Sequence, residues 1–198
     1  MCSSGLLANH SRGNAEKLMS KHEEILPGHG LHIDKMPGHW LLAQMGKRVL
    51  RPGGLELTRR MLDALNIVPT DRVVEFAPGL GVTAQLVLSQ SPSSYTAVEA
   101  DDAAARRVRS YLSGDNQRCV VGQAEQSGLP DGSATVVYCE AMLSRKPPED
   151  KVKIIQEATR LLAPGGRCGI HGLSVVPDDI DSVTRDAINR ELSQSIHV

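Results

Sequence analysis

The chain has 198 residues, 40% of them hydrophobic, which suits one domain with a sizeable core. Its formal net charge is −1 and it shows no long basic stripe, so bulk electrostatic binding to nucleic acid is not indicated. It shows no apolar run long enough to cross a bilayer, and the first ten residues do not resemble a signal peptide. The four cysteines lack paired metal spacing, so we expect reduced thiols in a cytoplasmic protein.

Residues 1–52 differ from the remainder of the chain. They hold five of the seven histidines and the only tryptophan, and Pro-Gly pairs at 27–28 and 37–38 break their periodicity. We expect a cap of short helices and loops that acts as a lid over a second unit, residues 53–198. The segment also holds side-chain types that bind zinc, but their spacing matches no known ligand set, so we expect no metal. These residues are His22, Glu23, Glu24, His29, His32, Asp34 and His39.

From residue 53 onward, helical and strand patterns alternate. Leu57, Met61 and Leu65 indicate a helix, and further helices are expected near 101–112 and 154–162. Short, valine-rich strands are expected at 72–76, 95–99, 118–121, 134–139 and 167–173. After residue 173, only an amphipathic helix at 178–196 is indicated. The alternation predicts an α/β fold with a doubly wound, mostly parallel sheet.

The segment E-F-A-P-G-L-G at 75–81 joins the first strand to a helix. Glycines let the backbone turn sharply and approach a ligand, and the helix start presents unpaired N–H groups. Such a loop binds adenosine-containing cofactors. Gly79-x-Gly81-x-x-Ala84 also fits the dinucleotide fingerprint, and either cofactor would place its ribose at Glu99. Glu75 opposes a pyrophosphate but favours a cationic amino-acid tail.

Four ordered stretches resemble the class I S-adenosylmethionine-dependent methyltransferases, in the branch that acts on small molecules and quinones. They are the loop at 75–81, the second strand with its terminal acid at 95–101, G-Q-A-E-Q-S-G-L-P-D-G-S at 122–133, and R-L-L-A-P-G-G at 160–166. The resemblance runs from about residue 53 to 173 and implies a Rossmann-like sheet in the order 3-2-1-4-5. Two positions depart from the family pattern: Ala77 replaces its first glycine, and Gln123 replaces its adenine-contacting acid.

The resemblance implies S-adenosylmethionine as cofactor and methyl transfer to a small organic acceptor by in-line displacement. It assigns cofactor binding to twelve residues: Gly53, Gly54, Glu75, Ala77, Pro78, Gly79, Gly81, Glu99, Ala100, Gln123, Ala124 and Glu140. Glu140 and His171 lie at carboxyl ends of strands and are the candidate catalytic groups. His39 and Trp40 are candidates to line the acceptor pocket. The tetrapeptide expected in amino-methylating enzymes of nucleic acids is absent after the fourth strand.

Two other functions stay open at this stage. One is an NAD(P)-dependent oxidoreductase that uses the fingerprint at Gly79. The other is a non-catalytic module that resembles a methyltransferase, which the departures at Ala77 and Gln123 would suit.

The resemblance also implies two further strands that form a hairpin beside the fifth strand, and no such pattern follows residue 173. Its absence would suit the non-catalytic module too. Without the hairpin the fifth strand would be an open sheet edge, so we expect either a longer polypeptide or self-association through this edge.

Overall fold

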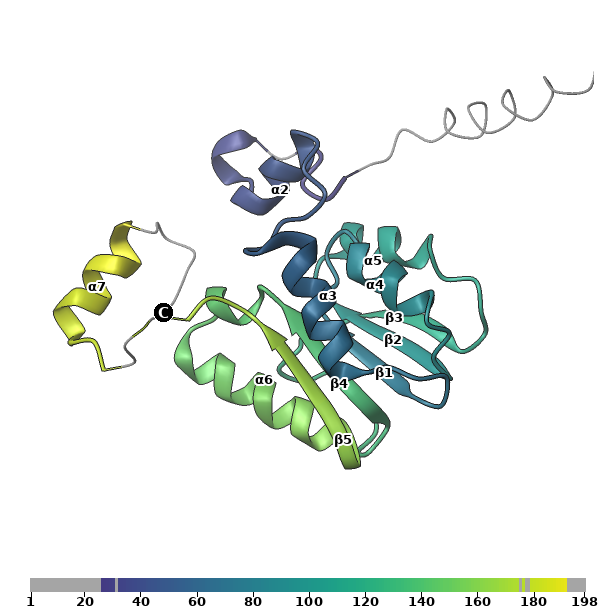
Figure 1. Ribbon diagram of the computed structural model, residues 1–198. Coiled ribbons are helices and arrows are strands. Elements are labelled where there is room, and N and C mark those ends of the chain that lie inside the picture. Colours follow the sequence, from purple (N-terminus) through teal and green to yellow (C-terminus); the bar gives the residue numbers. More distant parts are fainter. Residues whose placement is uncertain (1–25, 31, 175, 177–178, 192–198) are drawn as a thin grey trace, which may run out of the picture.

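The computed structural model describes residues 26–30, 32–174, 176 and 179–191. Its centre is a five-stranded parallel sheet in the order β3-β2-β1-β4-β5, which confirms the predicted topology (Figure 1). The strands are β1 Arg72–Phe76, β2 Ser94–Glu99, β3 Gln117–Val121, β4 Ala134–Glu140 and β5 Leu162–His171. Among the described residues, β5 pairs on one side only, with β4.

The register brings the ends of the strands to one edge. Phe76 at the end of β1 pairs with Val98 of β2 and with Cys139 of β4. Glu140 pairs in turn with His171, the last residue of β5. The loops that follow β1, β2 and β4 therefore meet at the carboxyl edge, where open α/β sheets bind their ligands.

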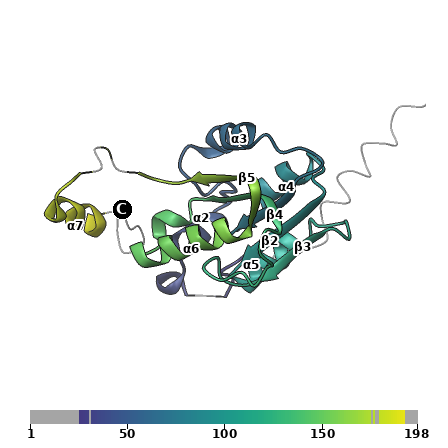
Figure 2. The ribbon, with the colours of Figure 1, turned by 90° about the horizontal axis from the view of Figure 1, so that it is seen from below.

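Helices cover both faces of the sheet. On one face, α3 (Gly54–Leu65), α4 (Val82–Leu88) and α5 (Asp102–Arg109) bury their apolar side chains in one core cluster. On the other face, α6 (Pro148–Leu161) buries Ile154, Ala158 and Leu161. Figure 2 shows α3 and α6 on opposite sides of β5. This three-layer arrangement explains why the strands are apolar on both faces.

The buried stripe of α3 agrees in part with the predicted repeat, since Leu65 is buried and Met61 packs against the core but Leu57 does not. Thr58, Leu62 and Leu65 are buried, whereas Leu57 is 39% exposed. Positions i, i+4 and i+7 lie on one face of a helix, so 58, 62 and 65 form the inner stripe. Leu57 instead covers Gly53, where an added Cβ would lie 2.1 Å from the Leu57 Cδ1. Gly53 thus makes room for a side chain of the helix.

The edge strand β5 is longer than predicted. Leu162 pairs with Ala134, and Arg167 pairs with Val136 two residues later, so a bulge takes up the Pro-Gly-Gly turn. Glycine 165 has φ +78° there. The turn was expected to precede the strand, but flanking hydrogen bonds to β4 absorb it as an irregularity.

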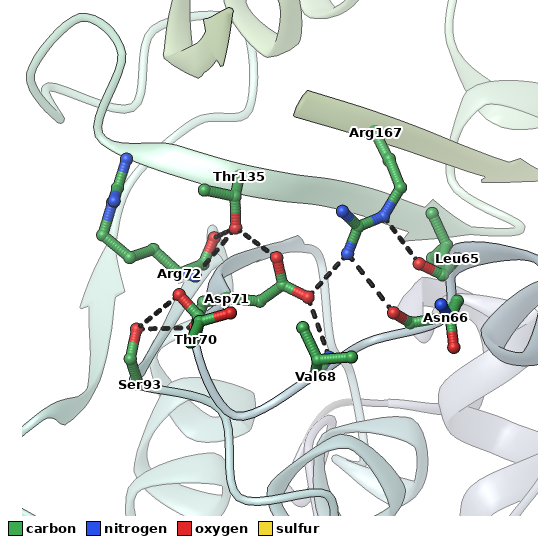
Figure 3. A network of polar contacts seen from close by, with 9 residues as sticks. All are labelled: Leu65, Asn66, Val68, Thr70, Asp71, Arg72, Ser93, Thr135 and Arg167. Atoms are coloured by element: carbon green, nitrogen blue, oxygen red, sulfur yellow. Dashed lines mark hydrogen bonds and ion pairs between the residues drawn. The ribbon is translucent and has the colours of Figure 1, made fainter. Parts of the chain in front are cut away.

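A polar network ties the start of β1 to β4, β5 and the end of α3 (Figure 3). Asp71 accepts hydrogen bonds from the Thr135 hydroxyl at 2.7 Å and the Val68 N–H at 2.8 Å, and pairs with Arg167 at 2.6 Å. Arg167 also donates to the Leu65 carbonyl at 2.7 Å. The network lies at the amino edge and holds the edge strand against the helix that covers it.

The two ends of the described chain differ in how they meet the sheet. At the amino end, η1 (Ile33–Lys35) and α2 (Gly38–Gln44) precede α3, and α2 buries Trp40 and Ala43 against Leu80 and Ala104. At the other end, α7 (Ser182–Glu191) lies apart from the sheet (Figures 1 and 2). The predicted helix extended to 178–196, of which 178 and 192–196 lie outside the described residues. No described helix is long and apolar enough to cross a membrane.

Candidate functional site

The loop between β1 and α4 turns through three residues with positive φ. Ala77, Gly79 and Gly81 have φ values of 52°, 56° and 73°. Gly81 begins α4, and an added Cβ there would lie 2.8 Å from the Tyr111 ring. Ala77 holds a conformation that favours glycine, so its methyl group comes with backbone strain, of the kind that gathers at ligand sites. Ala141, after β4, has φ 54° and repeats this feature across the site.

Glu99 ties this loop to the end of β2. Its carboxylate accepts the Gly79 N–H and the Asp101 N–H, each at 3.0 Å. Burial raises the pKa of Glu99, and the two N–H donors oppose that rise. Asp101 caps α5 by accepting the Ala104 N–H at 2.8 Å. The carboxylate is thus fixed in place at the carboxyl edge.

Glu75 is a buried carboxylate between two tyrosines. It accepts hydrogen bonds from the hydroxyls of Tyr138, at 2.6 Å, and Tyr95. Burial raises the pKa of Glu75 to about 7, although both hydroxyls act to lower it. The carboxyl group therefore titrates near neutral pH, and a cation beside it would restore its charge. Perturbed groups of this kind gather at functional sites.

Glu140 is the centre of a buried polar network. Its Oε1 lies 2.7 Å from the Thr58 hydroxyl, 3.0 Å from the Arg51 Nε and 2.9 Å from the His171 Nδ1. The Thr83 hydroxyl, in the first turn of α4, donates to Oε2. Four side chains, from the loop before α3, from α3, from α4 and from β5, therefore converge on one carboxylate. Both oxygens of Glu140 are engaged by the protein itself.

Two atoms of this network are buried without a hydrogen-bond partner among the described residues. They are the Arg51 Nη2 and the His171 Nε2. A buried unpaired donor costs about 1–3 kcal/mol, which a suitable ligand group would recover. Arg51 is the informative case, since it belongs to the loop before α3 and lines the same cavity as Glu140.

A cavity of about 210 Å³ opens at the carboxyl edge. Seven predicted cofactor residues line it: Glu75, Ala77, Pro78, Gly79, Glu99, Ala100 and Glu140. His39 and Trp40, named for the acceptor pocket, line it too. Its remaining walls come from Arg48, Leu50, Arg51, Leu80, Val82, Thr83, Asp101, Ala141 and Arg145.

Other predicted residues lie outside the lining of this cavity, for physical reasons. Leu57 covers Gly53, and Tyr111 covers Gly81. Ala124 is buried in the core against α6, and Gln123 pairs with Gln126 in an isolated bridge. His171 contacts Glu140 through its Nδ1, and Gly54 is the first residue of α3. Their roles toward a ligand stay predictions.

The comparisons with known proteins decide the family. Residues 74–170 match the methyltransferase type 11 family, described as a methyltransferase domain. Residues 74–170 therefore form a class I methyltransferase domain of the type 11 branch. Membership favours a sulfonium cofactor over the dinucleotide that the fingerprint at Gly79 had left open.

Similar proteins support the same fold. An uncharacterized protein of Haemophilus influenzae is 32% identical over 159 residues, which cover 77% of this chain and 63% of that protein. The chain thus spans less than two thirds of this relative. The YcgJ protein of Bacillus subtilis superimposes with a TM-score of 0.59 at 22% identity, covering 69% of this chain and 57% of that one. An S-adenosylmethionine-dependent methyltransferase of Mesorhizobium loti gives 0.51 at 17% identity, covering 58% and 51%.

The sequence analysis missed the arginines that line this cavity. Arg48 and Arg51 precede the Gly-rich turn before α3, and Arg145 lies in η2 (Leu143–Arg145) after β4. None belongs to a motif that the four stretches carry. The sequence places these arginines near strand ends and turns. Their convergence on one cavity, however, depends on the packing of α2 and η2 over the sheet. Of the candidate metal ligands, His22, Glu23 and Glu24 lie outside the described residues. The described residues, which include His29, His32, Asp34 and His39, hold no group of three side chains that could bind a metal ion.

Proposed function

We propose that the chain transfers a methyl group from S-adenosylmethionine to a small organic acceptor by in-line displacement. The observation that carries this is the cavity in which the strained Gly79 loop, the fixed carboxylate of Glu99 and the titratable Glu75 face one space. Family membership supports the donor, and the acceptor belongs to the proposal. The chain spans less than two thirds of its relative from Haemophilus influenzae, so the activity of the whole protein also belongs to the proposal.

The residues present suit the donor at three points. Glu99 offers a carboxylate to the ribose hydroxyls at the end of β2. Glu75 offers a partly neutralised carboxylate to the cationic part of the donor. The buried Arg51 Nη2, which has no partner among described residues, offers a donor to the carboxylate of the amino-acid tail. We expect Ala100, Gln123 and Ala124 to contact the adenine, and Gly53, Gly54, Pro78 and Gly81 to shape the walls.

The donor supplies a methyl group already activated by its sulfonium. The chain therefore has to orient two reactants and exclude water, and orientation alone supplies about 7–11 kcal/mol of a barrier. Trp40 suits the second task, since an added Cβ at Gly79 would lie 3.8 Å from its ring. His171 is the proposed base for an acceptor that must lose a proton. Glu140 would hold its Nδ1 and leave Nε2 for the proton.

Residues 1–52 are the proposed lid, of which 1–25 lie outside the described residues. Residues 53–198 are the proposed cofactor-binding domain. The non-catalytic module stays the alternative, which a binding result without turnover would favour. Pairing of β5 with a second copy through its open side remains a proposal as well.

The decisive test is calorimetric titration with S-adenosylmethionine, S-adenosylhomocysteine and NAD. We expect both sulfur compounds to bind and NAD to give no heat. Trp40 is the only tryptophan in the chain and lines the cavity, so its fluorescence should change with the same dissociation constants. A Trp40→Phe variant is the matched control for the optical signal. Tight NAD binding without a response to S-adenosylhomocysteine would overturn the proposal.

A further inference from the structure

The carboxylates that line the cavity are all engaged by the protein itself. Glu75 accepts from two tyrosine hydroxyls and Glu99 from two backbone N–H groups. Asp101 caps α5, and Glu140 is neutralised by Arg51 within its network. Each of these carboxylates is therefore already paired with groups of the protein.

Two arginines that line the cavity, Arg48 and Arg145, have no carboxylate partner among the described residues. Arg48 donates to the Ala43 carbonyl at 3.2 Å, and Arg145 donates to the His39 Nδ1 at 2.6 Å. Among the described residues, no carboxylate oxygen lies within 4.0 Å of either guanidinium. Both side chains are exposed where they line the cavity, although partial burial lowers the pKa of Arg145. Arg48 follows α2, and Arg145 lies in η2.

His39 makes Arg145 a fixed cation without cancelling its charge. Burial lowers the pKa of His39 to about 4, with the charge of Arg145 as the second cause. The imidazole is then neutral at physiological pH, so its Nδ1 accepts the guanidinium hydrogen. His39 belongs to α2 and stacks near Trp40, with ring centroids 4.3 Å apart. Arg145 is thus held at the opening by a neutral partner, with further N–H groups to donate.

Resting on the proposed function, we propose that the methyl acceptor carries an oxyanion, a carboxylate or a phosphate, which Arg145 binds at the mouth of the cavity. Guanidinium groups match both oxyanions with paired hydrogen bonds. Arg48 adds a second positive charge to the lining of the cavity. The donor occupies the inner end beside Glu99 and Glu75, so the charged end of the acceptor stays at the rim while its reacting atom enters. Neutral acceptors of the same shape are selected against, because Arg145 then gains no counter-charge.

The test measures probe binding to the protein saturated with S-adenosylhomocysteine. Benzoate, phenyl phosphate and benzamide share one ring and differ in charge, so they serve as the carboxylate, phosphate and neutral probes. Calorimetry and Trp40 fluorescence report the dissociation constants. We expect at least one anion to bind about tenfold more tightly than benzamide, the preference expected of a charge-assisted pair. The stronger of the two anions identifies the oxyanion.

Three variants separate this proposal from general charge effects. Arg145→Ala should remove the preference for the anion, and Arg145→Lys should keep part of it. Arg60→Ala is the control, because Arg60 is exposed on α3 and pairs with Glu56. Arg145→Ala should still bind S-adenosylhomocysteine, which shows that the variant folds.

The outcomes also distinguish the two proposals. If S-adenosylhomocysteine binds but the anions bind no better than benzamide, or bind Arg145→Ala equally well, the oxyanion site is refuted and the methyltransferase proposal stands. If S-adenosylhomocysteine itself does not bind, the methyltransferase proposal fails.

Discussion

At the scale of single residues, the site depends on two carboxylates in different states. Glu75 is buried between tyrosine hydroxyls, and its pKa is raised to about 7, whereas Glu99 is fixed by two backbone N–H groups. The first can gain or lose a proton as a ligand binds. The second is already oriented for hydroxyl groups. These states lead to separate predictions.

The titration of Glu75 predicts a pH-dependent affinity for S-adenosylhomocysteine. Its raised pKa means that the empty site is protonated below about pH 7. A cationic tail binds best to the ionised form, so below that pH binding must release a proton. Affinity should therefore fall as pH decreases from 8 to 6, by up to about tenfold per unit below the pKa. Calorimetry across this range checks it, and Glu75→Gln should abolish the dependence. An equal pH dependence of the affinity in both proteins would show that the amino-acid tail does not bind at Glu75.

The charge of Glu99 predicts a loss of affinity in Glu99→Gln. The amide keeps the shape and one acceptor, but charge-assisted hydrogen bonds worth about 1.5–3 kcal/mol become neutral ones worth about 0.5–1.5. S-adenosylhomocysteine should bind about tenfold more weakly by this difference. Glu56→Gln, at an exposed ion pair on α3, is the matched control. An unchanged dissociation constant in folded Glu99→Gln would place the ribose elsewhere.

At the scale of elements, the network around Asp71 holds β5 to the rest of the sheet (Figure 3). Burial raises the pKa of Asp71, but hydrogen bonds from Thr135, Val68 and Arg167 outweigh it, and the net pKa lies below the ordinary 3.8. A lowered carboxylate pKa stabilises the fold above the unfolded value, and that stability is lost as pH falls through the folded one. The free energy of unfolding should therefore decrease as pH falls below about 4.

Asp71→Asn tests this network. It removes the charge that Arg167 meets at 2.6 Å, so we expect a loss of about 1–3 kcal/mol in the free energy of unfolding at pH 7. Denaturant titrations at pH 7 and pH 3 measure both quantities. The difference between the two proteins should shrink at the lower pH, since Asp71 of the unchanged protein then approaches protonation. A constant difference would assign the loss to packing.

At the scale of the whole molecule, α2 and the sheet edge close the cavity between them. Within residues 26–52, α2 buries only Trp40 and Ala43, and the His39–Arg145 contact joins it to η2 across the opening. Few buried contacts mean a low free energy of local opening. Hydrogen exchange of α2 amides should slow when S-adenosylhomocysteine fills the cavity, while exchange in β1 and β4 should stay the same. Equal protection of α2 with and without the ligand would remove the lid from the mechanism.

Strand identity and strand order followed from local pattern and family motifs. β1 was predicted at its observed bounds, and β2, β3 and β4 within a residue or so, because short apolar runs bounded by polar turns admit few alternatives. The repeat at Leu57, Met61 and Leu65 located α3 but only part of its buried stripe, and β5 is longer than predicted. Packing on the sheet decides that Thr58 and Leu62 are buried and that Leu57 is not.

The sequence by itself determined the fold family, the Gly79 loop and the two acids at the ends of β1 and β2, since each is encoded in a contiguous motif. The tertiary structure alone decided which distant side chains complete the site. Glu140 meets Arg51, Thr58, Thr83 and His171 because five elements converge at one edge, and His39 meets Arg145 across 106 positions. Such contacts depend on how helices pack over the sheet, and no local spacing records that. The pKa of Glu75 has the same origin, because burial exists only once the chain has folded.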